Sequence, residues 1–260
     1  MSIVLKSPRQ VERIAGAGRV VAEALELAGS MTAPGVTTGE IDEAVEELIR
    51  SRGGIPTFKG YKLASVKMPY PASICASVNE EVVHGIPGGR LLEEGQILSV
   101  DVGVTLDGYI GDAARTFGVG EVAPEAQRLI DATRGCLAEA VAQVMPDNPL
   151  VEVSRAIQTH AEERGYSVVR DLVGHGVGEK MHEEPQIPNY VSVSGGSGVV
   201  LKPGMVLAIE PMVNLGGCEV RWLEDGWTVV TRDGSLSAHF ENTIAVTEEG
   251  GRILTETQDG

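Results

Sequence analysis

Apolar residues recur at the spacing of amphipathic helices in four segments of the chain. A capping box predicts that the first helix begins at Pro8, and a second capping box begins at Thr37. Pro124 opens the third segment, and the apolar positions from Val153 onward mark the fourth. The chain is therefore expected to contain two pairs of helices.

The second pair of helices repeats the first. Apolar and helix-breaking residues coincide when the chain is shifted by 112 positions, as in Leu25 and Leu137, Pro34 and Pro146, Ile41 and Val153, Val45 and Ile157, and Gly53 and Gly165. Apolar residues could match by chance, but matching breakers favour a duplicated helix-helix-strand unit. We expect one α/β domain over residues 1–260, with halves at about 7–118 and 119–250 and a site between them.

Two antiparallel strands are predicted across residues 99–112. Valines alternate there with small or polar residues, and Asp107-Gly108 is a strong hairpin turn. The turn fixes the register. Its expected pairs are Leu106 with Tyr109, Gly103 with Asp112, and Asp101 with Ala114. Asp101 and Asp112 then lie diagonally adjacent on one face of the hairpin, while the valines take the other.

Two neighbouring carboxylates beside a glycine leave a hole lined with oxygen atoms. Buried carboxylates without partners are costly, so this pair predicts one or two divalent cations. The alternative is an exposed hairpin with solvated aspartates, which is the better interpretation of an isolated pair. A turn one residue longer would also place Asp101 and Asp112 on opposite faces. The choice therefore depends on the rest of the chain.

Three more polar residues occur in unusual surroundings in the second half. Glu210 ends an apolar run and is held extended by the proline that follows it. Glu241 is expected in a strand whose opposite face is apolar. His175 stands among glycines, which let other groups approach it closely. The glutamates could instead pair with Lys or Arg, although few basic residues lie near them in the sequence.

Composition excludes several classes of protein. The net charge of -16 disfavours a nucleic-acid partner, because such binding neutralises phosphates with Lys and Arg. Three distant cysteines without a CxxC motif indicate neither a disulfide framework nor a thiolate zinc site. The start of the sequence has no long apolar segment, and no run of 18 apolar residues occurs. We expect a cytoplasmic protein without membrane contact.

Four carboxylates and one imidazole form the complete candidate ligand set. Its members are Asp101, Asp112, His175, Glu210 and Glu241. Two divalent cations balance their four negative charges, and bridging carboxylates hold paired metals about 3.5–4 Å apart in hydrolytic sites. A water between two such cations becomes a nucleophile near neutral pH. Hard oxygen ligands with one imidazole suit Mn, Fe, Co or Zn.

These residues and the motifs around them resemble those of the methionine aminopeptidases, within the M24 metallopeptidases. The resemblance runs from about Lys6 to Arg252 and rests on segments 99–103, 111–113, 174–178, 209–211 and 240–243. Segments 79–87 and 181–190 are similar to the type I pattern, in its short bacterial form. The resemblance implies the pita-bread fold, with two pseudo-symmetric halves around a central antiparallel sheet.

The resemblance also implies roles for individual residues. Asp101 would chelate one metal, Asp112 and Glu241 would bridge both, and His175 and Glu210 would complete the other. A hydroxide bridging the metals would attack the first peptide bond, with Glu210 shuttling the proton. The remaining implied site residues contact substrate: His84 and His182 at the developing oxyanion, and Tyr70, Cys75 and Trp227 in the methionine pocket.

The implied activity is removal of the N-terminal methionine from nascent proteins and peptides whose second residue is small. Its partners would be nascent chain N-termini, at the ribosome, and the enzyme would be a monomer. Asn242, Met181 and the segment 61–69 depart from the family pattern, which affects the surroundings of Glu241 and the pocket. The alternatives are an aminopeptidase or dipeptidase of the same fold with another specificity, and a non-catalytic binding protein.

Overall fold

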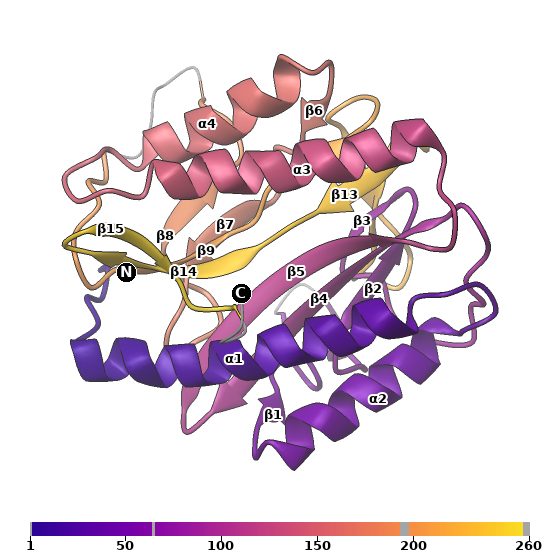
Figure 1. Ribbon diagram of the computed structural model, residues 1–260, viewed down its shortest axis with the longest axis horizontal. Helices are drawn as coiled ribbons and strands as arrows, with labels where there is room; N and C mark the ends of the chain where they lie inside the picture. The colour runs from indigo at the N-terminus through magenta and orange to yellow at the C-terminus, as the bar shows by residue number, and fades with distance from the viewer. Residues whose placement is uncertain (1, 64–65, 193–197, 257–260) are drawn as a thin grey trace.

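The computed structural model describes residues 2–63, 66–192 and 198–256, and contains the four expected helices (Figure 1). Helix α1 (Pro8–Met31) begins with the Ser7 capping box and α2 (Thr38–Ser51) with that of Thr37. The second pair is α3 (Pro124–Ala142) and α4 (Val151–Glu162). The four predicted helices are therefore confirmed.

Within the described residues the strands form four sheets. In the first half they are β1 (Ile55–Pro56), β2 (Cys75–Val78), β3 (Glu81–Val83), β4 (Ile97–Leu106) and β5 (Tyr109–Gly118). The second half has β6 (Ser167–Val168), β7 (Val173–Gly176), β8 (Glu183–Pro188), β9 (Val206–Ile209), β10 (Met212–Asn214), β11 (Val220–Trp222), β12 (Val229–Thr231), β13 (Ser237–His239), β14 (Asn242–Thr247) and β15 (Gly250–Ile253). All the strand pairings described between these elements are antiparallel.

The two halves repeat one another beyond their helices. Strands β1 and β6, which follow α2 and α4, begin at Ile55 and Ser167 and so keep the spacing of 112 positions. The breakers match as well, since Gly53 and Gly165 have φ values of 76° and 82°. Both close a helix in the left-handed conformation that glycine adopts without strain. The pseudo-symmetric arrangement of the fold is thus present in the backbone.

The predicted hairpin has the predicted register. Leu106 pairs with Tyr109, Gly103 with Asp112, and Asp101 with Ala114. The valines of β4 face α1 and α2 in a buried cluster with Ile41 and Val45. Asp101 and Asp112 therefore lie on the face turned away from the helices.

A second two-stranded ribbon crosses between sheets without losing its register. Strand β9 pairs with β14, where Ile209 faces Asn242, and β10 pairs with β13, where Met212 faces His239. Between these pairs both segments of the ribbon pass from the sheet of β9 and β14 to the sheet of β10 and β13. Glu210 and Glu241 occupy this interruption. The expectation that Glu241 lies within a strand is therefore wrong by one residue, because β14 begins at Asn242.

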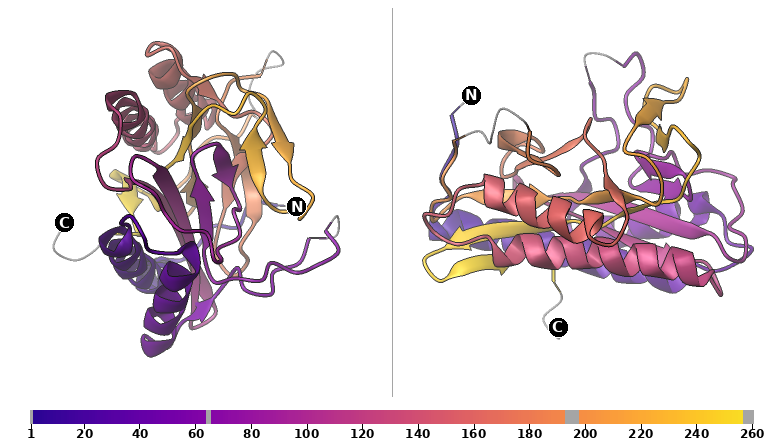
Figure 2. Two further views of the ribbon diagram at one scale, coloured as in Figure 1. Left: turned by 90° about the vertical axis from the view of Figure 1, so that its right-hand side faces the viewer. Right: turned by 90° about the horizontal axis from the view of Figure 1, so that it is seen from above.

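All four helices cover the same side of the sheets (Figure 2). Helices α3 and α4 pack on Leu207, Ile209 and Ile244 of the second half as α1 and α2 pack on the first. The β11–β12 hairpin lies on the opposite side. Within the described ranges, no helix is both long and apolar enough to cross a membrane.

Candidate active site

The candidate ligands lie in two neighbouring rows that cross the strands on the face without helices. In the first row, Cys75 is opposite Asp101 and Asp101 is opposite Ala114. Ala114 exchanges two backbone hydrogen bonds with Glu241, at 2.9 and 3.4 Å. The constant register of the ribbon then sets Glu241 opposite Glu210. This row crosses five strands or strand ends and contains three carboxylates, those of Asp101, Glu241 and Glu210.

The second row lies two residues away and carries the other two ligands. Asp112 is connected to Thr243, whose Oγ1 accepts from the Asp112 N–H at 3.0 Å and donates to the Asp112 carbonyl at 2.8 Å. Thr243 pairs with Ala208, and Ala208 pairs with His175. Small side chains between the ligands therefore leave space above the sheet for an ion.

Electrostatics alone would not predict that Glu210 and Glu241 stand opposite each other. Like charges directly across an antiparallel pair are destabilising. The ribbon keeps one hydrogen bond here, from the Phe240 N–H to the Pro211 carbonyl at 3.3 Å. Pro211 has no N–H to return it, and the Glu241 N–H donates to Ala114. A divalent cation between the two glutamates would offset this repulsion.

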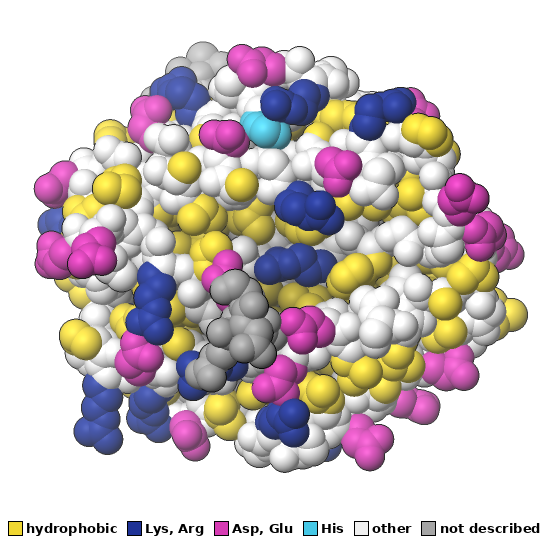
Figure 3. Space-filling model, in the orientation of Figure 1, with side chains coloured by type: hydrophobic (Ala, Val, Ile, Leu, Met, Phe, Trp, Pro, Cys, Tyr) yellow, Lys and Arg dark blue, Asp and Glu magenta, His cyan; other side chains and the backbone are white. Residues whose placement is uncertain are grey.

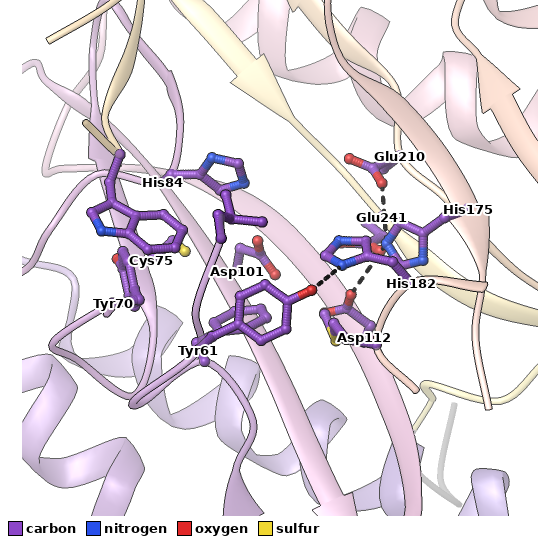
Figure 4. A pocket seen from close by; sticks show the side chains of 14 residues that line it. Tyr61, Tyr70, Cys75, His84, Asp101, Asp112, His175, His182, Glu210 and Glu241 are labelled. Atoms are coloured by element: carbon purple, nitrogen blue, oxygen red, sulfur yellow. Dashed lines mark hydrogen bonds and ion pairs between the residues drawn. The ribbon is translucent and has the colours of Figure 1, made fainter. Parts of the chain in front are cut away.

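Individual distances define the cluster (Figure 4). His175 Nε2 is 3.5 Å from Glu210 Oε1 and 3.9 Å from Asp112 Oδ2. Ligand atoms of Asp112, His175 and Glu241 all lie within 4.8 Å of one another. In the described part of the chain, one buried oxygen each of Asp101, Asp112 and Glu241 has no hydrogen-bond partner. Buried oxygens without donors, gathered around an imidazole, fit a divalent cation.

Burial perturbs every ionisable group of the cluster. It raises the pKa of Asp101 to about 7. Burial, followed by the neighbouring carboxylates, raises the pKa of Asp112, Glu210 and Glu241 well above the usual range. Burial lowers the pKa of His175 to about 3, so the ring is neutral. Its Nδ1 donates to the Gly176 carbonyl at 2.9 Å, which leaves the Nε2 lone pair free for a metal.

One cavity of about 180 Å³ is lined by the carboxylates and by apolar side chains. The rings of Tyr70 and Trp227 meet edge to face with centroids 5.2 Å apart. Tyr70 Oη donates to the Gly85 carbonyl at 2.8 Å, and Trp227 Nε1 donates to the Met68 carbonyl at 3.1 Å. Both rings are therefore fixed, and with the buried thiol of Cys75 they form a rigid wall.

Two further histidines stand at this cavity. Burial lowers the pKa of His84 to about 4 and also lowers that of His182, so both rings are neutral at pH 7. His182 Nδ1 is 2.7 Å from Tyr61 Oη, and its ring lies 4.4 Å from that of His175. His84 has a φ of 60°, a conformation that is rare for a bulky side chain. Such backbone strain is concentrated at functional sites.

The structure brings together all ten residues that the sequence suggested for the site. They line one cavity, together with Phe58, Tyr61, Leu63 and Met181. No sequence signal points to Phe58, whose ring occupies the space above Gly103 and so fills part of the predicted hole beside the two aspartates. Tyr61 and Met181 had stood out only as departures from a pattern. Ala64 and Ser65, in the same divergent segment as Tyr61, lie outside the described residues.

Comparison with known proteins agrees with this geometry. The model of metallopeptidase family M24 matches residues 12–248. The chain is 47% identical over 253 residues to the methionine aminopeptidase of Clostridium perfringens, with 97% of this chain and 98% of the relative covered. Methionine aminopeptidase 1 of Bacillus subtilis is 48% identical, with 97% and 99% covered. A crystal structure of methionine aminopeptidase from Thermotoga maritima matches with a TM-score of 0.93 at 46% identity, covering 98% of this chain and 100% of that one. The chain therefore belongs to metallopeptidase family M24, and its fold is the pita-bread fold of that family.

Proposed function

We propose that this chain is a methionine aminopeptidase, which removes the N-terminal methionine from nascent proteins and peptides whose second residue is small. The register that sets Cys75 directly beside Asp101 carries the proposal. It joins the carboxylate cluster to an apolar wall of a thiol and two aromatic rings, which suit a polarizable thioether. The names of the relatives support the same specificity.

The proposed metal centre holds two divalent cations, which are Co, Mn, Fe or Zn. Asp101 would hold one cation, His175 and Glu210 would hold the other, and Asp112 and Glu241 would be shared by both. The four carboxylates balance the charge of two such ions. When bound, the cations supply Lewis-acid activation of water and of the peptide carbonyl.

The protein groups around this centre orient the substrate and move its proton. Tyr70, Cys75 and Trp227 hold the methionine side chain, which fixes the first peptide bond above the carboxylates. Glu210 accepts a proton from the attacking water and returns it to the leaving amine. His84 and His182, being neutral, donate hydrogen bonds to the carbonyl oxygen as negative charge develops on it.

The cellular setting belongs to the same proposal. The substrates are polypeptide N-termini as they emerge at the ribosome, and the enzyme acts in the cytoplasm as a monomer. Residues 1–260 work as one catalytic domain, because each half contributes ligands to the same cluster. Neither nucleic acid nor membrane is part of the reaction.

Hydrolysis of two tripeptides tests this function. Metal-stripped protein is refilled with Mn²⁺ or Co²⁺ and given Met-Ala-Ser or Leu-Ala-Ser, beside the variants Glu210→Gln and Glu249→Gln. We expect metal-dependent release of Met alone. Loss of the proton carrier in Glu210→Gln should lower kcat by at least about 100-fold. Glu249 is exposed in the turn between β14 and β15, beyond the end of β14 that adjoins Glu241, and its variant should retain full activity.

Other results would point to the alternatives. Equal cleavage of the Leu peptide would indicate an aminopeptidase of broader specificity. Absence of cleavage of both peptides by protein that binds two metal ions would contradict the proposal and favour a binding protein or a dipeptidase. Full activity of Glu210→Gln would disprove the role given to that carboxylate.

A further inference from the structure

A guanidinium lies directly behind the carboxylate cluster, on the helix side of the sheet. Arg115 follows Ala114 on β5, so its side chain points away from the face that carries Asp112. It reaches a groove between α1 and α3 whose other lining residues include Arg134, Phe240 and Thr255. Basic side chains are visible in this hollow in an otherwise acidic protein (Figure 3).

Arg115 holds the backbone of a candidate metal ligand. Its Nη1 donates to the Glu241 carbonyl at 2.5 Å and to the Ala114 carbonyl at 2.8 Å. Its Nη2 donates to Asn242 Oδ1 at 2.6 Å. The planar guanidinium thus spans the peptide unit that joins Glu241 to Asn242. Hydrogen bonds from a charged donor are roughly twice as strong as neutral ones.

The Asn242 side chain, which accepts from Arg115, is also held by Thr255. Asn242 Oδ1 also accepts from Thr255 Oγ1 at 2.9 Å. Thr255 Oγ1 in turn accepts from the Thr243 N–H at 3.2 Å. The Asn242 side chain therefore cannot turn away from Arg115 without breaking two contacts.

Glu241 needs such support because regular strand pairing does not supply it. It stands at the interruption between β13 and β14, where the ribbon changes sheets. The Ala114 N–H reaches the Glu241 carbonyl only at 3.4 Å, a long hydrogen bond. Among the described hydrogen bonds to this carbonyl, that of Arg115 is the shorter one.

We propose that Arg115 is a positioning residue: with Asn242 it fixes the peptide unit after Glu241 and so aims the Glu241 carboxyl at the cation site. This inference rests on the proposed function, because it takes Glu241 as a metal ligand. Groups that orient a ligand typically change metal affinity 10–100-fold when they are removed. Arg115 touches neither the ion nor the substrate.

Cation binding by metal-stripped protein tests the proposal without any need for turnover. Calorimetry with Mn²⁺ and absorption spectra with Co²⁺ are compared for the unmodified protein, Arg115→Met, Arg115→Lys and the control Arg134→Met. Arg134 lies in the same groove over the Phe240 ring, at 5.2 Å, and its Nη1 donates to the exposed Asp131 at 3.4 Å. We expect Arg115→Met to bind Mn²⁺ at least about tenfold more weakly, with an altered Co²⁺ spectrum.

The lysine variant and the control separate positioning from simple structural support. Arg115→Lys keeps the charge but cannot bridge both acceptors, so its affinity should fall between the other two. Arg134→Met should bind as the unmodified protein does. A purely structural role would lower the unfolding temperature of the metal-free variant and leave its affinity and its Co²⁺ spectrum unchanged.

The possible failures are distinguishable. If the unmodified protein binds no Mn²⁺ or Co²⁺, the proposed function fails. If it binds them and Arg115→Met binds equally well with the same spectrum, the inference is overturned. Should Arg115→Met not fold, Arg115→Lys and Asn242→Ala decide: weaker binding in either supports the clamp, and unchanged binding in both overturns it.

Discussion

Small side chains shape the cation site as much as the charged ones do. Ala114 separates Asp101 from Glu241, and Ala208 separates Thr243 from His175, so the ligands stand around a hollow and not against one another. Gly174 and Gly176 let neighbouring backbone pack closely on both sides of His175, because a Cβ at either would lie within 2.5 Å of a backbone oxygen. The small residues next to the candidate ligand side chains therefore help to identify the site in the sequence.

The Tyr61 hydroxyl holds the His182 ring in place at the cavity. Replacing Tyr61 by Phe removes the contact with His182 Nδ1 and frees the imidazole to rotate. The loss of one hydrogen bond of about 1 kcal/mol should lower kcat/KM for Met-Ala-Ser about fivefold. Steady-state kinetics measure this change. Mn²⁺ affinity should stay the same, and a parallel loss of affinity would show that Tyr61 acts on the metal site instead.

Glycines allow helix α1 to pack closely on the β4–β5 hairpin and on the C-terminal segment. A Cβ at Gly18 would lie 2.1 Å from the Leu254 carbonyl oxygen, and a Cβ at Gly111 would lie 2.6 Å from the Gly18 nitrogen. Backbone therefore packs on backbone immediately beside Asp112. Gly16 is on the same helix, but a Cβ there would meet its nearest neighbours at 3.8 and 3.9 Å, which is ordinary contact.

Two alanine substitutions in α1 should consequently have opposite effects. Gly16→Ala should stabilise the protein by about 0.5–1 kcal/mol, because alanine favours helix and nothing obstructs it. Gly18→Ala should destabilise it by about 2 kcal/mol or more, since backbone atoms cannot move aside easily. Urea unfolding of the metal-free protein measures both values. Stabilisation by Gly18→Ala would show that α1 is not in close contact with the backbone at Leu254.

Local signals predicted most of the elements, and non-local contacts explain what they did not. The Asp107-Gly108 turn sets the hairpin register by itself, so the neighbourhood of Asp101 and Asp112 was readable from the sequence. The start of β14 was not, because the ribbon changes sheets through contacts with β5. Phe58 and Arg115 act on residues more than 40 positions away, and no periodicity encodes such contacts.

At the scale of the whole molecule, the site is a seam between two repeated halves. Asp101 and Asp112 come from the first half, whereas His175, Glu210 and Glu241 come from the second. Each half can bury its own apolar core beneath its own helices. Neither half alone contains all five candidate ligands. Cation binding should therefore stabilise the assembled protein.

Metal removal tests this expectation. At a free Mn²⁺ concentration 100 times Kd, binding should add about 2.7 kcal/mol to the free energy of unfolding. For a chain of this size that corresponds to a rise in Tm of about 5–10 °C. Thermal unfolding with and without Mn²⁺ measures the difference.

The Glu241→Gln variant provides the comparison. Without metal it should be more stable than the metal-free unmodified protein, because one of two opposed carboxylates is gone. It should also gain much less from Mn²⁺. An equal rise in Tm for both proteins would mean that the cation binds elsewhere.

The backbone hydrogen bonds between Ala114 and Glu241 join segments that are synthesised at different times. Strand β5 leaves the ribosome long before the residue that completes its row, and at about 5–20 residues per second the delay is on the order of ten seconds. During that time the hairpin can fold on α1 and α2, yet it has only two of the five ligands. A cation that needs all five candidate ligands could therefore bind only after Glu241 has been made.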